Sequence, residues 1–170
     1  MNRLGDYDYV LPPELIAQYP APHRDASRLL VLDRKRSSIA HRQFCQLGDF
    51  LKKGDVLVVN DTKVLPARLL GRRQTGGRVE ILFLKALDEE RFEALIKPLG
   101  RLKEGEDIFL GHGVSLRLLD AKKKIIGVSK GRASVVMKKF GQMPLPPYIR
   151  RAPERLDRQR YQTVFASKPG

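Results

Sequence analysis

Cysteine, tryptophan and long apolar segments are scarce or absent in this sequence. Its one cysteine, Cys45, excludes an intrachain disulfide, and with only three histidines beside it we expect no zinc cluster or other metal site. We expect Cys45 to be a small buried residue. The sequence has no phosphate-binding loop and no Gly-x-Gly-x-x-Gly fingerprint. Its N-terminal region lacks an apolar segment of membrane-spanning length, so we expect a cytoplasmic protein without a membrane partner.

Acidic residues are also few. The 170 residues include 33 Lys and Arg against 19 Asp and Glu, which gives a net charge of +14. This excess favours a polyanionic partner, with nucleic acid as the first candidate and an anionic membrane surface as the alternative. Hydrophobic residues make up 42% of the chain, enough for a real core in one domain or two small ones.

A short apolar run and the polar residues after it form the most informative stretch. Residues 56–59 predict a buried strand, because all four are valine or leucine. Ligands of open α/β sheets bind beyond the carboxyl ends of strands, so the residues that follow are candidate site residues. An ordinary polar turn after a core strand would give the same pattern. The candidates are Asn60, Asp61, Thr62 and, after a second apolar run, Arg68.

The region before this strand alternates helical and strand patterns. Residues 13–17 and 43–51 favour short helices, and residues 29–32 and 39–42 favour strands, so residues 1–66 have an α/β pattern. Between them lies a polar loop that contains two arginines. Guanidinium groups match phosphate and carboxylate geometry, so the loop is either an anion site or a solvated loop with an internal Arg–Asp pair. Its polar residues are Arg24, Asp25, Ser27 and Arg28.

The middle of the chain has a different texture. Its apolar runs are short, evenly spaced and separated by glycines or charges, which predicts a small β-barrel or sandwich. Residues 67–140 carry 17 cationic and 9 anionic side chains, a net charge of +8. We expect the second and third runs to form a hairpin. The predicted strands are 67–70, 78–87, 91–97, 107–110, 114–119, 124–128 and 132–136.

A proline-rich segment follows the predicted barrel. Three prolines among residues 144–147 exclude a helix and favour a stiff, extended connector. The chain continues through an arginine-rich region to Gly170, where we expect no terminal helix or strand. That ending indicates a cut within a longer protein.

Six motifs in order resemble one protein family. They are YDY (7–9), LIAQYP (15–20), RDASRL (24–29), VNDTKVLPAR (59–68), MPLPPYI (143–149) and RYQTVF (160–165). Together they resemble the N-terminal half of S-adenosylmethionine:tRNA ribosyltransferase-isomerase, the QueA family of queuosine biosynthesis. The resemblance implies a transferase and isomerase that moves the ribosyl part of S-adenosylmethionine to the aminomethyl-deazaguanine wobble base of tRNA. Adenine and methionine leave, and the product is epoxyqueuosine-tRNA.

The resemblance also implies an α+β, mostly β fold, in which a small β-barrel is inserted into an α/β domain. On this sequence, residues 1–66 are expected to begin the α/β catalytic domain and residues 67–142 to form the barrel. Residues 143–170 are then the connector that returns into the α/β domain. Because relatives are longer, we expect this chain to hold an incomplete active site.

The family reaction assigns hypothetical roles to the candidate residues. Asp61 is the candidate for proton transfer, because the attacking aminomethyl group must lose a proton, or for holding that aminomethyl group. S-adenosylmethionine is expected as a co-substrate, precursor-bearing tRNA as the partner, and no cofactor or metal. Arg24 and Arg28 are expected to bind a phosphate or the methionine carboxylate. The remaining substrate-binding residues are Asp25, Ser27, Asn60, Thr62, Arg68, Tyr161, Gln162 and Thr163.

Two other classes of function remain open. The basic barrel and the arginine-rich region fit a non-catalytic RNA-binding module whose affinity falls steeply with salt. They also fit a structural barrel whose charge serves only solubility. S-adenosylmethionine binding separates the enzyme from the RNA-binding module, and salt-sensitive tRNA binding separates the module from the structural barrel.

Overall fold

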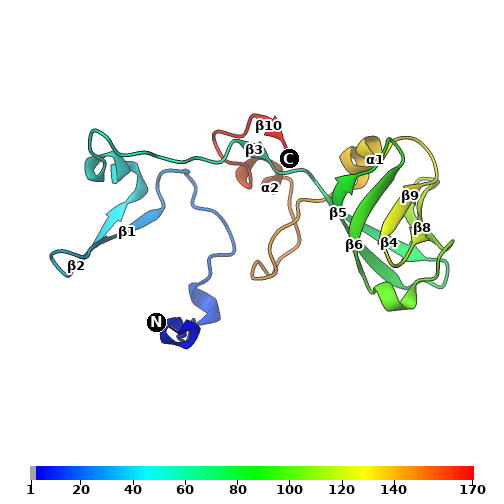
Figure 1. Cartoon of the computed structure of the whole chain (residues 1–170), viewed down its shortest axis with the longest axis horizontal. Coiled ribbons are helices and arrows are strands. Elements are labelled where there is room, and N and C mark those ends of the chain that lie inside the picture. Colours follow the sequence, from blue (N-terminus) through cyan, green and yellow to red (C-terminus); the bar gives the residue numbers. More distant parts are fainter. Residues whose placement is uncertain (1–2) are drawn as a thin grey trace. The chain divides into compact units, whose positions relative to one another are not determined.

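The computed structural model describes residues 3–170, which divide into two compact units (Figure 1). Met1–Val59 and Pro147–Arg151 form the N-terminal unit, and Asn60–Pro146 with Ala152–Gly170 form the barrel unit. These units are defined by contacts within this chain. The domain boundaries that the sequence predicted, 1–66, 67–142 and 143–170, therefore stay predictions.

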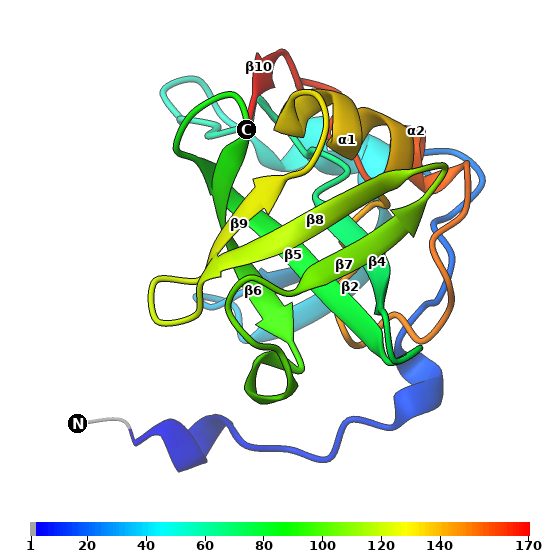
Figure 2. The ribbon, with the colours of Figure 1, turned by 90° about the vertical axis from the view of Figure 1, so that its right-hand side faces the viewer.

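Six antiparallel strands close into a barrel in the order β4-β5-β6-β9-β8-β7 (Figure 2). This confirms the predicted small barrel and its hairpin of β5 and β6, and the chain is mostly β with few helices. Closure pairs both edges of the sheet, so no edge is left to pair with another chain. The strands are β4 (Arg68–Arg73), β5 (Arg78–Ala86), β6 (Arg91–Lys97), β7 (Asp107–Gly111), β8 (Val114–Asp120) and β9 (Ile125–Val128).

The barrel core follows from side-chain alternation along the strands. In β6, Phe92, Ala94 and Ile96 are buried while the residues between them are more exposed. The Phe92 ring packs on Phe83 with ring centroids 5.2 Å apart. Burial of this apolar surface supplies the main stabilising term. Other strand residues that fill the core are Leu69, Val79, Ile81, Ile108, Leu116, Leu118 and Ile126.

Closure of the barrel between β4 and β7 depends on a glycine. A Cβ atom at Gly71 would lie 2.5 Å from Cγ2 of Ile108 and 3.2 Å from the carbonyl oxygen of Phe109. No side chain fits there without displacing backbone or core atoms. Gly71 therefore lets the first strand of the barrel approach the strand that closes it.

The last predicted strand, residues 132–136, is wrong: the structure has a helix there, α1 (Ala133–Phe140). Its buried residues are Ala133, Val136 and Met137, which have helical spacing. That spacing places all three on one face, of which Ala133 and Val136 join the barrel core, and the β-branched residues 135 and 136 do not outweigh it. The helix ends at Gly141, whose amide donates to the carbonyl of Met137 (2.8 Å).

From residue 3 onward, the N-terminal unit contains one hairpin and three short 3-10 helices. Strands β1 (Arg28–Asp33) and β2 (Ser38–Gln43) pair antiparallel, as the sequence predicted. The helical patterns at 13–17 and 43–51 correspond to 3-10 turns rather than α-helices. These short helices are η1 (Leu4–Tyr7), η2 (Pro13–Leu15) and η3 (Phe44–Phe50).

Two predictions within the N-terminal unit are wrong. Residues 56–59 form no strand, and the side chains of Val56 and Val58 are each 88% exposed. A buried strand needs neighbouring strands, and none within residues 3–170 pairs with this segment. Cys45 is exposed rather than buried, because η3 packs against a two-stranded hairpin, which is too small to cover it.

Four further elements complete the described chain. η4 (Leu99–Arg101) follows β6, and α2 (Asp157–Arg160) lies in the arginine-rich region. β3 (Thr62–Lys63) pairs in parallel with β10 (Lys168–Pro169), so the prediction of no terminal strand is wrong. The proline-rich segment contains no helix, as expected. None of the helices within residues 3–170 has the length and apolar character needed to cross a lipid bilayer.

Candidate active site

The polar residues after position 59 form a tight turn in the barrel unit. Oδ1 of Asn60 accepts a hydrogen bond from the amide of Thr62 (2.9 Å), which is the local bond expected of an asparagine turn. The carbonyl of Asp61 accepts from the amides of Ser167 (2.7 Å) and Lys168 (3.0 Å). The turn is thereby tied to the last residues of the described chain.

The side chains of Gln162 and Thr163, which lie about a hundred residues later in the sequence, form hydrogen bonds with this turn. Oε1 of Gln162 accepts from the amide of Val64, and Nε2 of Gln162 donates to the carbonyl of Val64, both at 2.8 Å. Oγ1 of Thr163 donates to the carbonyl of Asn60 (2.7 Å). The structure therefore brings together five of the predicted site residues, which we call the polar cluster: Asn60, Asp61, Thr62, Gln162 and Thr163.

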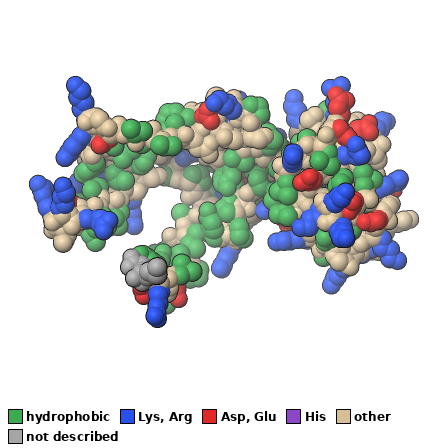
Figure 3. All heavy atoms as spheres, in the orientation of Figure 1, with side chains coloured by type: hydrophobic (Ala, Val, Ile, Leu, Met, Phe, Trp, Pro, Cys, Tyr) green, Lys and Arg blue, Asp and Glu red, His purple; other side chains and the backbone are tan. Residues whose placement is uncertain are grey.

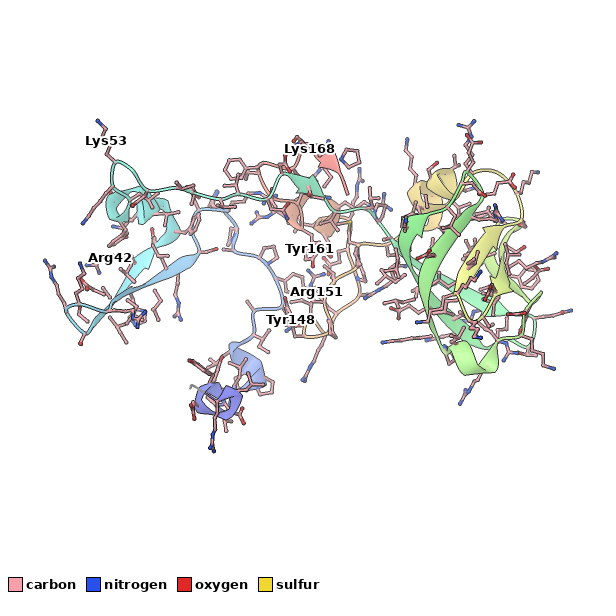
Figure 4. All side chains as sticks on the ribbon, in the orientation of Figure 1. Arg42, Lys53, Tyr148, Arg151, Tyr161 and Lys168 are labelled. Carbon is pink, nitrogen blue, oxygen red and sulfur yellow. The ribbon has the colours of Figure 1, made fainter. Side chains whose placement is uncertain are left out.

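Asp61 has a cationic partner that the sequence did not reveal. Its Oδ2 lies 2.9 Å from Nζ of Lys168, and the two side chains are 44% and 77% exposed. Figure 4 labels Lys168, which lies on β10. An ion pair this exposed contributes about 0–1 kcal/mol, so the carboxylate remains available to other partners. The pair depends on the register of β3 and β10, which no local motif predicts.

Arg68 joins the start and the end of the barrel. Its Nη2 donates to the carbonyl of Leu145 (3.1 Å), and its Nε lies 3.1 Å from Oε1 of Glu80 without making a hydrogen bond. Its backbone exchanges two hydrogen bonds with Gln142, at 3.2 and 2.8 Å. These contacts give Arg68 a structural role, and its substrate-binding role stays a prediction.

Tyr161 follows the short helix α2 and is exposed. Its amide donates to the carbonyl of Asp157 (2.9 Å). Asp157 is only 3% exposed, and its Oδ2 accepts from the amide of Glu154 (2.7 Å). The sequence analysis missed this buried carboxylate. An aspartate that opens a helix next to a recognised motif is the signal that could have found it.

The remaining four predicted site residues lie in the N-terminal unit. Arg24, Asp25 and Ser27 are exposed in the loop that leads into β1, and Arg28 is the exposed first residue of that strand. The carbonyls of Asp25 and Ser27 accept from the amides that begin η3, at 3.0 and 2.8 Å. The loop backbone thus positions η3, and the anion site stays a prediction.

Comparison with known proteins identifies the family. A family model described as "Queuosine biosynthesis protein" matches residues 4–170. The chain belongs to this family. A protein of Syntrophomonas wolfei named S-adenosylmethionine:tRNA ribosyltransferase-isomerase is 48% identical over 99% of this chain and 49% of its own length. A protein of Sulfurihydrogenibium with the same name is 44% identical over 99% of this chain and 51% of its own length.

A solved structure belongs to the same group of relatives. The S-adenosylmethionine tRNA ribosyltransferase of Thermotoga maritima is 37% identical, with a TM-score of 0.40 over 79% of this chain and 48% of that one. The chain therefore spans about half the length of the curated relatives it matches. The recognition of the family from its six motifs is confirmed.

Two of the family motifs contact each other within the N-terminal unit. Nε2 of Gln18 donates to the carbonyl of Tyr148 (3.1 Å), and its Oε1 accepts from the amide of Arg150 (2.6 Å). Arg151 donates from Nε to the carbonyl of Gln18 (2.8 Å), and its guanidinium lies 4.3 Å from the ring centroid of Tyr19. Figure 4 labels Tyr148 and Arg151. The motif LIAQYP thus anchors residues 147–151.

Several carboxylates of the barrel have lowered pKa values. Hydrogen bonds from Arg73, at 2.6 and 3.1 Å, lower the pKa of Glu106. A hydrogen bond from Arg117 likewise lowers the pKa of Asp107. These pairs brace β-strands and turns of the barrel rather than the polar cluster. Within residues 3–170, no three His, Cys, Asp or Glu side chains gather closely enough to hold a metal ion.

Proposed function

We propose that the protein to which these residues belong transfers and isomerises the ribosyl moiety of S-adenosylmethionine onto the wobble base of tRNA. The acceptor is the aminomethyl-deazaguanine precursor, and the product is epoxyqueuosine-tRNA. The observation that carries the proposal is 44–48% identity over 99% of the chain to relatives named for this reaction. Membership of the queuosine biosynthesis family supports it.

The chemistry of the polar cluster agrees with this reaction. The aminomethyl nitrogen of the acceptor forms a bond to the ribosyl group and loses a proton, and adenine and methionine leave. A carboxylate near the nitrogen can take that proton, and we assign this role to Asp61. Asn60 and Thr62, on the same turn, offer side-chain groups for ribose hydroxyls or the base edge.

Gln162 and Thr163 act in this proposal as positioning residues. Their side chains already form hydrogen bonds with the backbone of residues 60 and 64, so their role is to fix the turn rather than to contact the substrate. Arg24 and Arg28 bind an anionic group of a substrate, with Asp25 and Ser27 beside them. The partners are S-adenosylmethionine and precursor tRNA, the setting is the cytoplasm, and the net charge of +14 favours the polyanion.

Adenine release from S-adenosylmethionine, measured with tRNA that carries the precursor base, tests the proposal. We would compare three proteins: this chain, the same residues joined to the second half of the Syntrophomonas wolfei relative, and that relative itself as the positive control. We expect release by the joined protein and the relative. A joined protein that binds S-adenosylmethionine and tRNA but releases no adenine would contradict the proposal.

A non-catalytic RNA-binding module is the second candidate function. The observation in its favour is the cationic excess of the closed barrel: residues 67–140 carry 17 cationic against 9 anionic side chains. On the face seen in Figure 3, Lys and Arg side chains project from the barrel in several directions. This candidate predicts salt-sensitive tRNA binding without S-adenosylmethionine binding, and equilibrium dialysis with labelled S-adenosylmethionine separates it from the enzyme.

A further inference from the structure

The outer face of the barrel carries a groove that the reaction does not explain. We propose that this groove, which we call the RNA groove, binds an unpaired nucleotide of an RNA strand. Phe109 stacks on the base, and Arg72 and Arg78 bind the phosphates beside it. The proposal rests on the proposed function only in naming tRNA as the natural strand. RNA binding itself is measured without S-adenosylmethionine.

The strand register places the three side chains in one row. Arg72 on β4 lies directly opposite Arg78 on β5 and opposite Phe109 on the neighbouring strand β7. Direct partners in a sheet point to the same face, with Cβ atoms about 5 Å apart. Leu69 and Gly71, the residues next in line on β4, are buried, so the row points out of the barrel.

The groove has the size and the surface of a ligand site. Its volume is about 850 Å³, and its walls come from β4 to β7. Phe109 is 47% exposed and Leu70 is 50% exposed, so an aromatic ring and an aliphatic side chain are both open to a partner. The lining residues that matter here are Leu70, Arg72, Arg78, Glu80, Lys97 and Phe109.

The two arginines are an unusual pair for an exposed sheet. Like charges directly opposite each other destabilise a strand pair. Arg73, Arg91 and Arg117 of the same barrel have carboxylate partners, at 2.6, 2.6 and 2.8 Å. Arg72 and Arg78 have none among residues 3–170. An anion between their guanidinium groups would remove this repulsion.

The charge around the row also favours an anion. Arg72 donates to the carbonyl of Gly76 (3.2 Å), which holds its guanidinium near the hairpin turn without neutralising it. Among the described residues, Glu80 is the one acidic residue that lines the groove, and Arg68 already pairs with it at 3.1 Å. Lys97 lies opposite Glu80 in the register and adds a further cation.

An exposed aromatic ring beside cations matches a nucleic-acid strand better than a protein partner. Aromatic rings stack on unpaired bases without regard to sequence, and arginine forks fit phosphate oxygens. An apolar protein segment would use Leu70 and Phe109 but would leave the arginine pair uncompensated. A second copy of this chain would bring two such pairs together. Charge complementarity therefore selects RNA as the occupant.

Fluorescence anisotropy with an unmodified tRNA transcript tests the RNA groove in the 170-residue chain. Alanine at Phe109 should weaken binding about 5- to 100-fold, and tyrosine there should restore it, because both aromatic rings stack. Glutamine at both Arg72 and Arg78 should reduce the slope of log affinity against log salt by about 1.4, or about 0.7 per lost phosphate contact on a single strand.

The matched control removes two cations elsewhere on the same barrel. Lys122 and Lys123 lie in the exposed turn between β8 and β9, so Lys122→Gln with Lys123→Gln makes the same change in charge. We expect this control to keep most of the affinity, and thermal melting to give equal midpoints for all variants. Equal losses in the control and in the arginine variant would overturn the proposal, as would full tRNA affinity in Phe109→Ala.

Two further results keep the proposals separate. A groove that governs RNA binding, in a joined protein that releases no adenine, would leave the RNA groove standing and the proposed reaction without support. Adenine release by groove variants whose KM for tRNA is unchanged would support the proposed reaction and overturn the RNA groove. Self-association that is lost in Phe109→Ala, with RNA binding intact, would assign the groove to a second copy of the chain.

Discussion

The side chain of Gln162 is the most testable link between the fold and the polar cluster. It exchanges two hydrogen bonds of 2.8 Å with the backbone of Val64, as a neighbouring strand would. A typical intramolecular hydrogen bond contributes about 1 kcal/mol net. Gln162 is half-buried, so water will partly replace the lost bonds. We expect Gln162→Ala to lower the free energy of local opening at Val64 by about 1–2 kcal/mol.

Amide hydrogen exchange of Val64 measures this change directly, since its donor loses its acceptor. A loss of about 1–2 kcal/mol corresponds to exchange about 5- to 30-fold faster. The amide of Ile126, buried in the barrel, serves as the internal control and should not change. Gln162→Glu keeps an acceptor for the Val64 amide and should have the smaller effect. Unchanged exchange at Val64 in Gln162→Ala, or equal acceleration at Ile126, would refute this account of the turn.

Three further predictions concern the barrel and the chemistry. Gly71→Ala should destabilise the chain by about 1–3 kcal/mol in urea unfolding, because its Cβ would meet Ile108, and a stability equal to wild type would show that β4 shifts freely. Arg73 lowers the pKa of Glu106, so the pair stabilises the folded state at pH values above the ordinary glutamate pKa, and this stabilisation is lost as the pH falls through the lowered pKa. Arg73→Met should therefore flatten the decline of stability at acid pH, and an unchanged profile of stability against pH would contradict this account. Asp61→Asn in the joined protein should reduce adenine release about 100-fold or more, and near-normal turnover would remove Asp61 from proton transfer.

The barrel was predictable because its signal is local and repeated. Alternation like that of Phe92, Ala94 and Ile96 recurs along the barrel strands, and four of the six pairings join strands that are consecutive in sequence. The helix over residues 133–140 was missed because two adjacent valines favour a strand, and only the barrel surface shows which face is buried. Segment 56–59 was wrongly predicted as a strand for the same reason: its composition favours a strand, but strand formation depends on partners.

The candidate site divides in the same way. The turn at Asn60 follows from short polar side chains that bond to nearby backbone, so sequence suffices for it. Gln162 and Thr163 came from the family motif, and nothing in their own spacing indicates that they contact residues about a hundred positions earlier. Lys168 and Asp157 depend on tertiary register and burial, and were missed.

The paired backbones of Arg68 and Gln142 have a consequence for how this protein can vary. Their two mutual hydrogen bonds hold the two ends of the barrel side by side, with Cα atoms about 5 Å apart. The chain between them therefore forms a module whose first and last residues lie next to each other. Insertions or deletions within that module leave the spacing of Arg68 and Gln142 unchanged. The barrel can therefore diverge, or be exchanged for another compact module, while the residues around Asn60 and Gln162 keep their geometry.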